Sequence, residues 1–213
     1  MSMEKRFLEL VSRAFRYPTV DFGNSLRELE AYSSGKMPGQ AARAGLAREE
    51  AGKYFLNDLE EIYADLFYIK PLVSLDIGYQ LFGDERKRVE FLLHLKTLQQ
   101  RHSVDCGTEL PDSLPNILTL LTRMAEGEDR DELVRLALAP ALGKMLAVMV
   151  RAKEEKDAKE KGTKDHGWSE ATQFIKNRKR RSKGIPVYLP LMELLAEQVN
   201  AAAAAAAGVE TGG

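Results

Sequence analysis

The sequence predicts an all-α protein, a single-domain bundle of about six to eight helices with a charged C-terminal extension. Apolar residues recur at i, i+3, i+4 and i+7 through most of the 213 residues, which is the spacing of one buried helix face. No alternating apolar and polar run is long enough for a strand, since the best short apolar run, residues 187–189, sits among prolines. Short Gly- and Pro-containing segments separate the periodic stretches, as is typical of a bundle.

The N-terminal stretch predicts two helices joined by a short loop. Ser2 is placed to cap the first helix, and Tyr17-Pro18 ends it because proline disfavours helical backbone at the preceding residue. A second helix follows, and the loop of residues 35–39 then breaks the pattern with two glycines and a proline. The apolar stripe of the first helix is Phe7, Leu10, Val11, Ala14 and Phe15, and that of the second is Leu26, Leu29 and Tyr32.

A long helix is expected next, from about residue 48 to residue 67, with Phe55 and Leu59 on its buried face. Pro71 separates it from a short segment over residues 75–82, and Gly83-Asp84 is a turn. A further helix through Val89, Leu92 and Leu93 ends near His102, and residues 103–113 form a loop.

The last part of the expected core has two more helices. Asp112 or Ser113 is placed to cap the first of them, because Pro115 would then lie in its first turn. The second covers residues 133–150 and contains Pro140, which is expected to kink or split it.

Composition changes after residue 150. Eleven of the fifteen residues 151–165 are charged, which indicates a solvated extension or a mobile linker, with Glu155–Lys159 and Glu160–Lys164 as supporting helical pairs. A basic run at 176–183 precedes a short apolar helix over residues 188–199, which the alanines 201–207 can continue. The expected division is a helical core at 1–150, a charged segment at 151–187, and a C-terminal helix and low-complexity tail at 188–213.

Composition also limits the chemistry. Lys and Arg number 31 against 32 Asp and Glu, so the surface as a whole is not built for nucleic acid or anionic lipid. A lone Cys106 excludes an intramolecular disulfide, and His102 lies near it without the further ligands that a structural zinc site needs. Phosphate-binding glycine motifs are absent, so no cofactor and no metal are expected. The charged start differs from a secretory signal and cations interrupt the best apolar run, so no stable membrane insertion is expected.

Two functional alternatives stay open on these grounds. Residues 176–183 carry six cations in eight positions, enough to contact a nucleic-acid backbone, so a nucleic-acid-binding helical protein is one hypothesis. The second is a small enzyme that uses the Cys106 thiol, which would need a base and a lowered pKa.

Four short motifs, in a fixed order, point to another class. Arg16-Tyr17-Pro18 stands near the start, followed by Glu61-Ile62-Tyr63-Ala64-Asp65-Leu66-Phe67 and then by Phe82-Gly83-Asp84-Glu85-Arg86. Glu109-Leu110-Pro111-Asp112-Ser113-Leu114-Pro115 leads into the next apolar helix. Over residues 7–150 this order resembles the nitrate reductase delta-subunit group of molybdoenzyme assembly chaperones, the NarJ branch of the TorD/DmsD-like family.

The resemblance implies an all-α, cytoplasmic, non-enzymatic chaperone. Its expected partner is the N-terminal segment of the molybdopterin-containing catalytic subunit of an oxidoreductase, held until its cofactor is inserted. A homodimer is also compatible with this class. The family often has His after the Asp of the E-x-P-D loop; here the position is Ser113, so no role of an imidazole carries over.

The resemblance and the physics of peptide binding select one set of candidates. Tyr63 and Phe67 could line an apolar groove, although i, i+3, i+4 spacing also describes a core stripe, and we expect Leu66 and Phe67 to be core. Glu109 and Asp112, stiffened by Pro111, could pair with cations of the peptide, and capping is the alternative for Asp112. Arg86 and Arg88 are expected in local ion pairs, with a partner's acids as the alternative. The candidate peptide-binding residues are Tyr63, Leu66, Phe67, Arg86, Glu109, Pro111 and Asp112, and no catalytic residue is expected.

Overall fold

The computed structural model describes residues 3–162 and 171–210, with side chains over residues 3–158 and 183–208. Over these residues the protein is all-helical, which confirms the predicted fold class. The only extended pairing in this described part is an isolated antiparallel bridge between Asp76 and Ser113. The helices are α1 (Lys5–Ala14), α2 (Phe22–Lys36), α3 (Ala41–Ala51), α4 (Leu56–Phe67), α5 (Ile77–Phe82), α6 (Arg86–Arg101), α7 (Leu114–Arg123), α8 (Glu128–Glu132), the π-helix η1 (Leu133–Leu138), α9 (Ala139–Gly162) and α10 (Ala171–Glu210).

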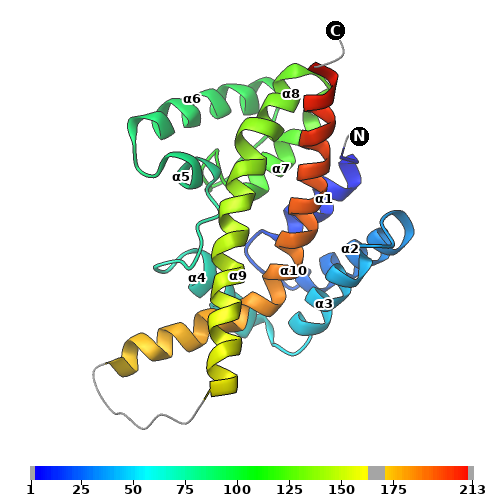
Figure 1. The fold of residues 1–213 in the computed structure, drawn as a ribbon. Coiled ribbons are helices and arrows are strands. Elements are labelled where there is room, and N and C mark those ends of the chain that lie inside the picture. The colour runs from blue at the N-terminus through cyan, green and yellow to red at the C-terminus, as the bar shows by residue number, and fades with distance from the viewer. Residues whose placement is uncertain (1–2, 163–170, 211–213) are drawn as a thin grey trace.

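Helices α9 and α10 cross the middle of the bundle (Figure 1). Helix α10 packs against α3, α4, η1 and α9, and α1 packs against α2 and α7. Helix α5 lies against α9, and α6 rests on α5 at the edge of the bundle. The core therefore lies where α10 meets the N-terminal helices.

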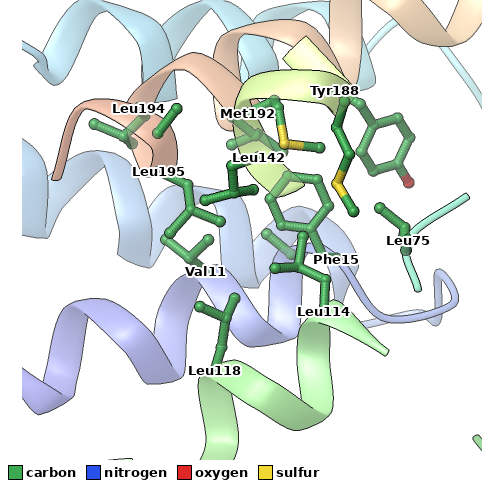
Figure 2. Packing of buried hydrophobic residues seen from close by; sticks show 14 of the residues in the cluster. Val11, Phe15, Leu75, Leu114, Leu118, Leu142, Tyr188, Met192, Leu194 and Leu195 are labelled. Carbon is green, nitrogen blue, oxygen red and sulfur yellow. The ribbon is translucent and has the colours of Figure 1, made fainter. Parts of the chain in front are cut away.

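The C-terminal helix supplies a large part of this core. Its apolar residues from Ile185 to Val199 include Tyr188, Met192 and Leu195, each with no exposed surface. Figure 2 shows these side chains interleaved with Val11 of α1 and with Phe15, the residue directly after that helix. The helical core thus continues well beyond residue 150, where the composition change had suggested its end. Further members of the same cluster are Leu75, Leu114, Leu118, Leu142 and Leu194.

Helix α10 is also much longer than the predicted helix of residues 188–199. It begins at Ala171 and continues through Pro186, Pro190 and the alanine run. A proline inside a helix removes one hydrogen bond, and here the burial of apolar neighbours on both sides compensates for it. At Gly184 the helix crosses α4 so closely that an added Cβ would lie 3.0 Å from Cγ2 of Ile62.

The single helix predicted from residue 48 to residue 67 is wrong, because α3 ends at Ala51 and α4 begins at Leu56. Phe55 was expected on the buried face, but it precedes α4 and is 85% exposed. Its backbone N–H donates a 3.2 Å hydrogen bond to the Asp58 carboxylate, which caps the N-terminus of α4.

Pro140 does not split its helix. Helical backbone continues from α8 through η1 into α9, and Pro140 lies in the first turn of α9. Proline has no backbone N–H to donate to the carbonyl oxygen one turn earlier in the helix. The wider π-helical turn of η1 lies directly before Pro140.

By length and composition alone, the stretch Glu128–Ala158 is long and apolar enough to cross a membrane. One face of this stretch is part of the core, where Leu142, Met145 and Met149 are buried. A buried core helix passes the same test of length and composition.

Candidate functional site

Three of the four sequence motifs lie around the side chain of Tyr63, and the motif at residues 82–86 does not. The ring of Tyr17, from the loop after α1, packs edge-on against the Tyr63 ring with 5.5 Å between centroids. Tyr68, at the end of α4, packs against the same ring at 5.8 Å. The Tyr68 hydroxyl donates a hydrogen bond to the Glu109 carboxylate. We call Tyr17, Tyr68 and Glu109 together the tyrosine–glutamate surface.

Tyr63, Leu66 and Phe67 form the buried floor beneath this surface. Leu66 and Phe67 are in the core, as predicted. Tyr63, which the sequence left undecided, is 3% exposed, and its hydroxyl donates a 2.8 Å hydrogen bond to the carbonyl oxygen of Phe15. Burial raises the pKa of Tyr63, so its hydroxyl stays a neutral donor. These three residues position the surface and are covered from solvent.

Tyr17 and Tyr68 are accessible to a partner, because each is 50% exposed. Partial burial, reinforced by the Glu109 carboxylate, raises the pKa of Tyr68, which keeps the phenol protonated and donating to Glu109. Next to them in the chain, Ile69 and Leu110 are also exposed. An exposed aromatic and aliphatic group beside one carboxylate is typical of a protein-binding surface.

The loop that carries Glu109 is held by side chains from two helices. Gln99 of α6 donates a 2.8 Å hydrogen bond to the carbonyl oxygen of Pro111. Asn116 of α7 donates a 3.0 Å hydrogen bond to the carbonyl oxygen of Leu110. Both polar side chains are buried, so the backbone on the C-terminal side of Glu109 is fixed. Pro111 itself is half-buried.

Asp112 was expected either to cap the helix that follows it or to pair with a peptide. The capping prediction is wrong for α7, whose N-terminal residue Ser113 also makes no side-chain cap. The Asp112 carboxylate instead accepts a 3.1 Å hydrogen bond from the backbone N–H of Gly78, in the first turn of α5. Asp112 is fully buried, so it faces the protein interior. Its chain segment turns inward because the backbone around Ser113 pairs with the strand-like segment at Asp76.

Arg88 forms ion pairs with three acidic side chains that lie near it. Its guanidinium contacts the carboxylates of Asp76 at 2.9 Å, Asp112 at 3.2 Å and Asp84 at 3.5 Å. It also lies over the Tyr79 ring, 5.5 Å from the centroid. The predicted local ion pairing of Arg88 is confirmed, and burial still raises the pKa of Asp112 despite this cation.

Arg86 stands apart from the tyrosine–glutamate surface. Its side chain is 92% exposed and pairs with Glu90 one turn along α6 at 3.3 Å, which confirms the local ion pair. An exposed pair of this kind adds little to stability. Nothing in the contacts of Arg86 links it to Glu109.

The tyrosine–glutamate surface has the chemistry of a binding site. A carboxylate beside phenol rings can hold an Arg or Lys side chain by a charge-assisted hydrogen bond and by cation–π contact. Cys106 is half-buried, and burial raises the pKa of its thiol, which lowers its thiolate fraction. Within the residues whose side chains are described, no group of three or more His, Cys, Asp or Glu could hold a metal ion.

Sequence reasoning missed several residues of this site. Tyr68 directly follows the Tyr63-to-Phe67 motif, and an exposed aromatic residue next to a core stripe was the available signal. Gln99 and Asn116 are ordinary helix residues in the sequence, and only their burial beside the loop shows their role.

The basic cluster lies in α10, but the side chains of 176–182 are outside the described residues, so nucleic-acid binding stays a prediction. The predicted pairs Glu155–Lys159 and Glu160–Lys164 also involve side chains outside the described residues.

No family model matches the chain, and no curated protein matches it.

Proposed function

We propose that the protein is an assembly chaperone that binds the N-terminal segment of a molybdopterin-containing oxidoreductase subunit, of the nitrate reductase type. It holds the segment until the cofactor is inserted and the subunit docks on its membrane or protein partner. The protein performs no catalysis in this role, works in the cytoplasm, and needs no cofactor of its own.

One observation carries the proposal. The motifs that resemble the chaperone family are far apart in the sequence, yet Tyr17 and Glu109 of two motifs and Tyr68, directly after a third, meet at one accessible surface. Core packing alone requires neither the exposure of Tyr17 and Tyr68 nor the placement of a carboxylate against Tyr68.

The chemistry of this surface favours a peptide that carries a cation next to apolar side chains. Tyrosine rings give a large contact area with few rotatable bonds to immobilise, and the Glu109 carboxylate selects Arg or Lys. The surface rests on Tyr63, a buried side chain with its own hydrogen bond, so little ordering accompanies binding.

The test is affinity capture from an extract of cells that express a molybdopterin-type oxidoreductase, with bound proteins identified by mass spectrometry. We expect the catalytic subunit to be recovered with the wild-type protein and to be depleted with the Glu109→Gln variant. Recovery of no such subunit, or equal recovery with both proteins, would count against the proposal.

A further inference from the structure

A hollow lies at the N-terminal end of α4, opposite the end that carries the tyrosine–glutamate surface. It has a volume of about 260 Å³ and is formed by the loop after α1, the first turns of α2, the end of α3 and the start of α4. Its floor is apolar, since Phe22, Ala51 and Leu59 are buried there. Small-molecule sites usually occupy roughly 300–1,000 Å³, so this hollow suits one or two side chains better than a cofactor.

The charged side chains that line the hollow are all positive. Arg27 and Arg48 line it, and no Asp or Glu does so among the residues that the structure describes. Arg27 donates to the amide oxygen of Asn24 and has no ion pair within the described part of the chain. Arg48 uses its Nε–H for Glu30, which is not part of the lining.

Two of the acidic groups close to the lining in the sequence are already engaged, and two others, Asp21 and Glu49, adjoin lining residues without being part of the lining. Glu50 pairs with Lys53, and the Asp58 carboxylate accepts the backbone N–H of Phe55. The two guanidiniums each retain N–H donors, because a guanidinium has five. A carboxylate entering the hollow would therefore meet the charge of Arg27, which no acid in the described part of the chain pairs with, and the remaining N–H donors of Arg48 beside an apolar floor.

Two large apolar side chains are exposed at this place. Val20 lines the hollow and is 82% exposed. Phe55 stands between Tyr54 and Leu56, which both line it, and is 85% exposed. Single exposed apolar residues are ordinary, but two beside a cationic hollow form the apolar rim that a peptide could cover.

We propose that this hollow, the Arg27–Arg48 hollow, binds a partner peptide through an Asp or Glu side chain. The carboxylate is held by Arg27 and Arg48, and an apolar side chain next to it in the peptide covers Val20 and Phe55. Charge complementarity selects this partner over a cationic one, because paired guanidiniums bind carboxylates with directional hydrogen bonds.

This site is separate from the tyrosine–glutamate surface and does not rest on the proposed chaperone function. Leu56 and Tyr68 lie at the two ends of α4, about 18 Å apart at 1.5 Å per residue, although Tyr17 of the surface and Val20 of the hollow belong to the same short loop after α1. The two surfaces also select opposite charges, Glu109 a cation and the Arg27–Arg48 hollow an anion.

The probe is a short peptide, acetyl-Ala-Leu-Glu-Phe-Ala-amide, whose only charge is the Glu side chain. Its matched control carries Gln in place of Glu. Titration of the full-length, ¹⁵N-labelled protein should shift the amide signals of Val20, Gly23 and Gly52, with roughly tenfold tighter binding of the Glu peptide.

The Arg27→Gln variant should remove the preference for the Glu peptide. Arg27 is exposed and bonds only within its own helix, so this variant should keep its fold, which an unchanged melting temperature would confirm. Arg123→Gln, an exposed arginine at the end of α7, is the matched control and should bind like the wild type.

Equal affinity for the Glu and Gln peptides would overturn the proposal. So would shifts confined to Tyr17 and Tyr68, which would place the peptide on the other surface. A Gln peptide with a free C-terminus that binds better than the Glu peptide would assign the hollow to a terminal carboxylate and would equally overturn the assignment to a side chain.

Discussion

The backbone N–H of Gly78 and the Asp112 carboxylate are joined by a 3.1 Å hydrogen bond, and there is no room between them for a side chain. A Cβ on Gly78 would lie 2.7 Å from Oδ2 of Asp112 and 3.0 Å from the Phe91 ring. This contact connects α5 to the loop before α7, and Arg88 of α6 closes it from a third side.

Gly78→Ala should therefore destabilise the protein by about 2–4 kcal/mol, because overpacking adds to the loss of the bond with Asp112. Chemical denaturation measures the free energy of unfolding. Gly143→Ala is the control: this helical glycine has open space around its Cβ position and should gain up to about 1 kcal/mol. Equal effects at both positions would contradict the close contact.

Asp112 should make stability depend on pH in an unusual direction. Burial raises its pKa above the ordinary value of 3.8, so the folded state takes up a proton before the unfolded state does as pH falls. The contribution of Asp112 to the free energy of unfolding is therefore most favourable below pH 3.8 and is lost as pH rises through the folded pKa.

The check is Asp112→Asn, which keeps an oxygen for Gly78 and does not titrate. Wild type should gain stability relative to this variant between about pH 7 and about pH 4, measured by chemical denaturation at each pH. A relative loss over the same range would show that the ion pair with Arg88 outweighs burial.

The tyrosine–glutamate surface should bind through its accessible groups. Glu109→Gln and Tyr68→Phe each should weaken binding of a cation-bearing peptide by roughly tenfold, because the first removes the negative charge and the second removes the hydroxyl that is bonded to it. Isothermal titration calorimetry measures the affinity, and the melting temperature should hardly change. Glu126→Gln, an exposed carboxylate after α7, is the control, and a loss equal to that of Glu109→Gln would refute the assignment.

Loss of the hydroxyl group should change the free energy of unfolding in opposite directions at two buried tyrosines. The Tyr188 hydroxyl is buried and has no hydrogen-bond partner among the described residues, so Tyr188→Phe should raise the free energy of unfolding by about 1 kcal/mol. Tyr63→Phe breaks the bond to the Phe15 carbonyl and should lower it by about 1–2 kcal/mol. Denaturation curves of the two variants provide the comparison.

Removing the C-terminal helix should abolish folding. A chain ending at Val150 lacks side chains such as Tyr188, Met192 and Leu195, each worth about 1.5–3 kcal/mol when buried. Together with the other large buried apolar residues of α10 they contribute roughly 14–27 kcal/mol, which is as much as or more than the about 5–15 kcal/mol that stabilises a typical domain. These other residues are Ile185, Val187, Leu189, Leu191, Leu194 and Val199. Near-ultraviolet circular dichroism should show no fixed tertiary packing, whereas a chain ending at Ala203 should keep it.

The helical class could be predicted because it depends on local spacing. The stripe of Phe7, Leu10 and Val11 is buried where the period placed it, and Leu66 and Phe67 are core residues. The end of α3 was missed because Gly52 is a weak signal inside an apolar pattern, and the capping of α4 by Asp58 was not foreseen.

The site could be predicted only in part, because its parts come from distant segments. Glu109 was correctly placed on a loop, but its partner Tyr68 is 41 residues away in sequence. Asp112 was expected either to cap the next helix or to pair with a peptide, whereas its partners Gly78 and Arg88 belong to other elements. Local pattern carries no information about such pairings.

The position of α10 has a consequence for biosynthesis. Helices α3, α4 and α9 pack against the buried side chains of residues 185–199 of α10. The ribosome adds these residues after the other buried segments that the structure describes. The apolar faces of those earlier helices stay open during most of translation, at about 5–20 residues per second. The nascent chain therefore exposes apolar faces for several seconds, and a helper that shields them would act before the C-terminal helix is complete.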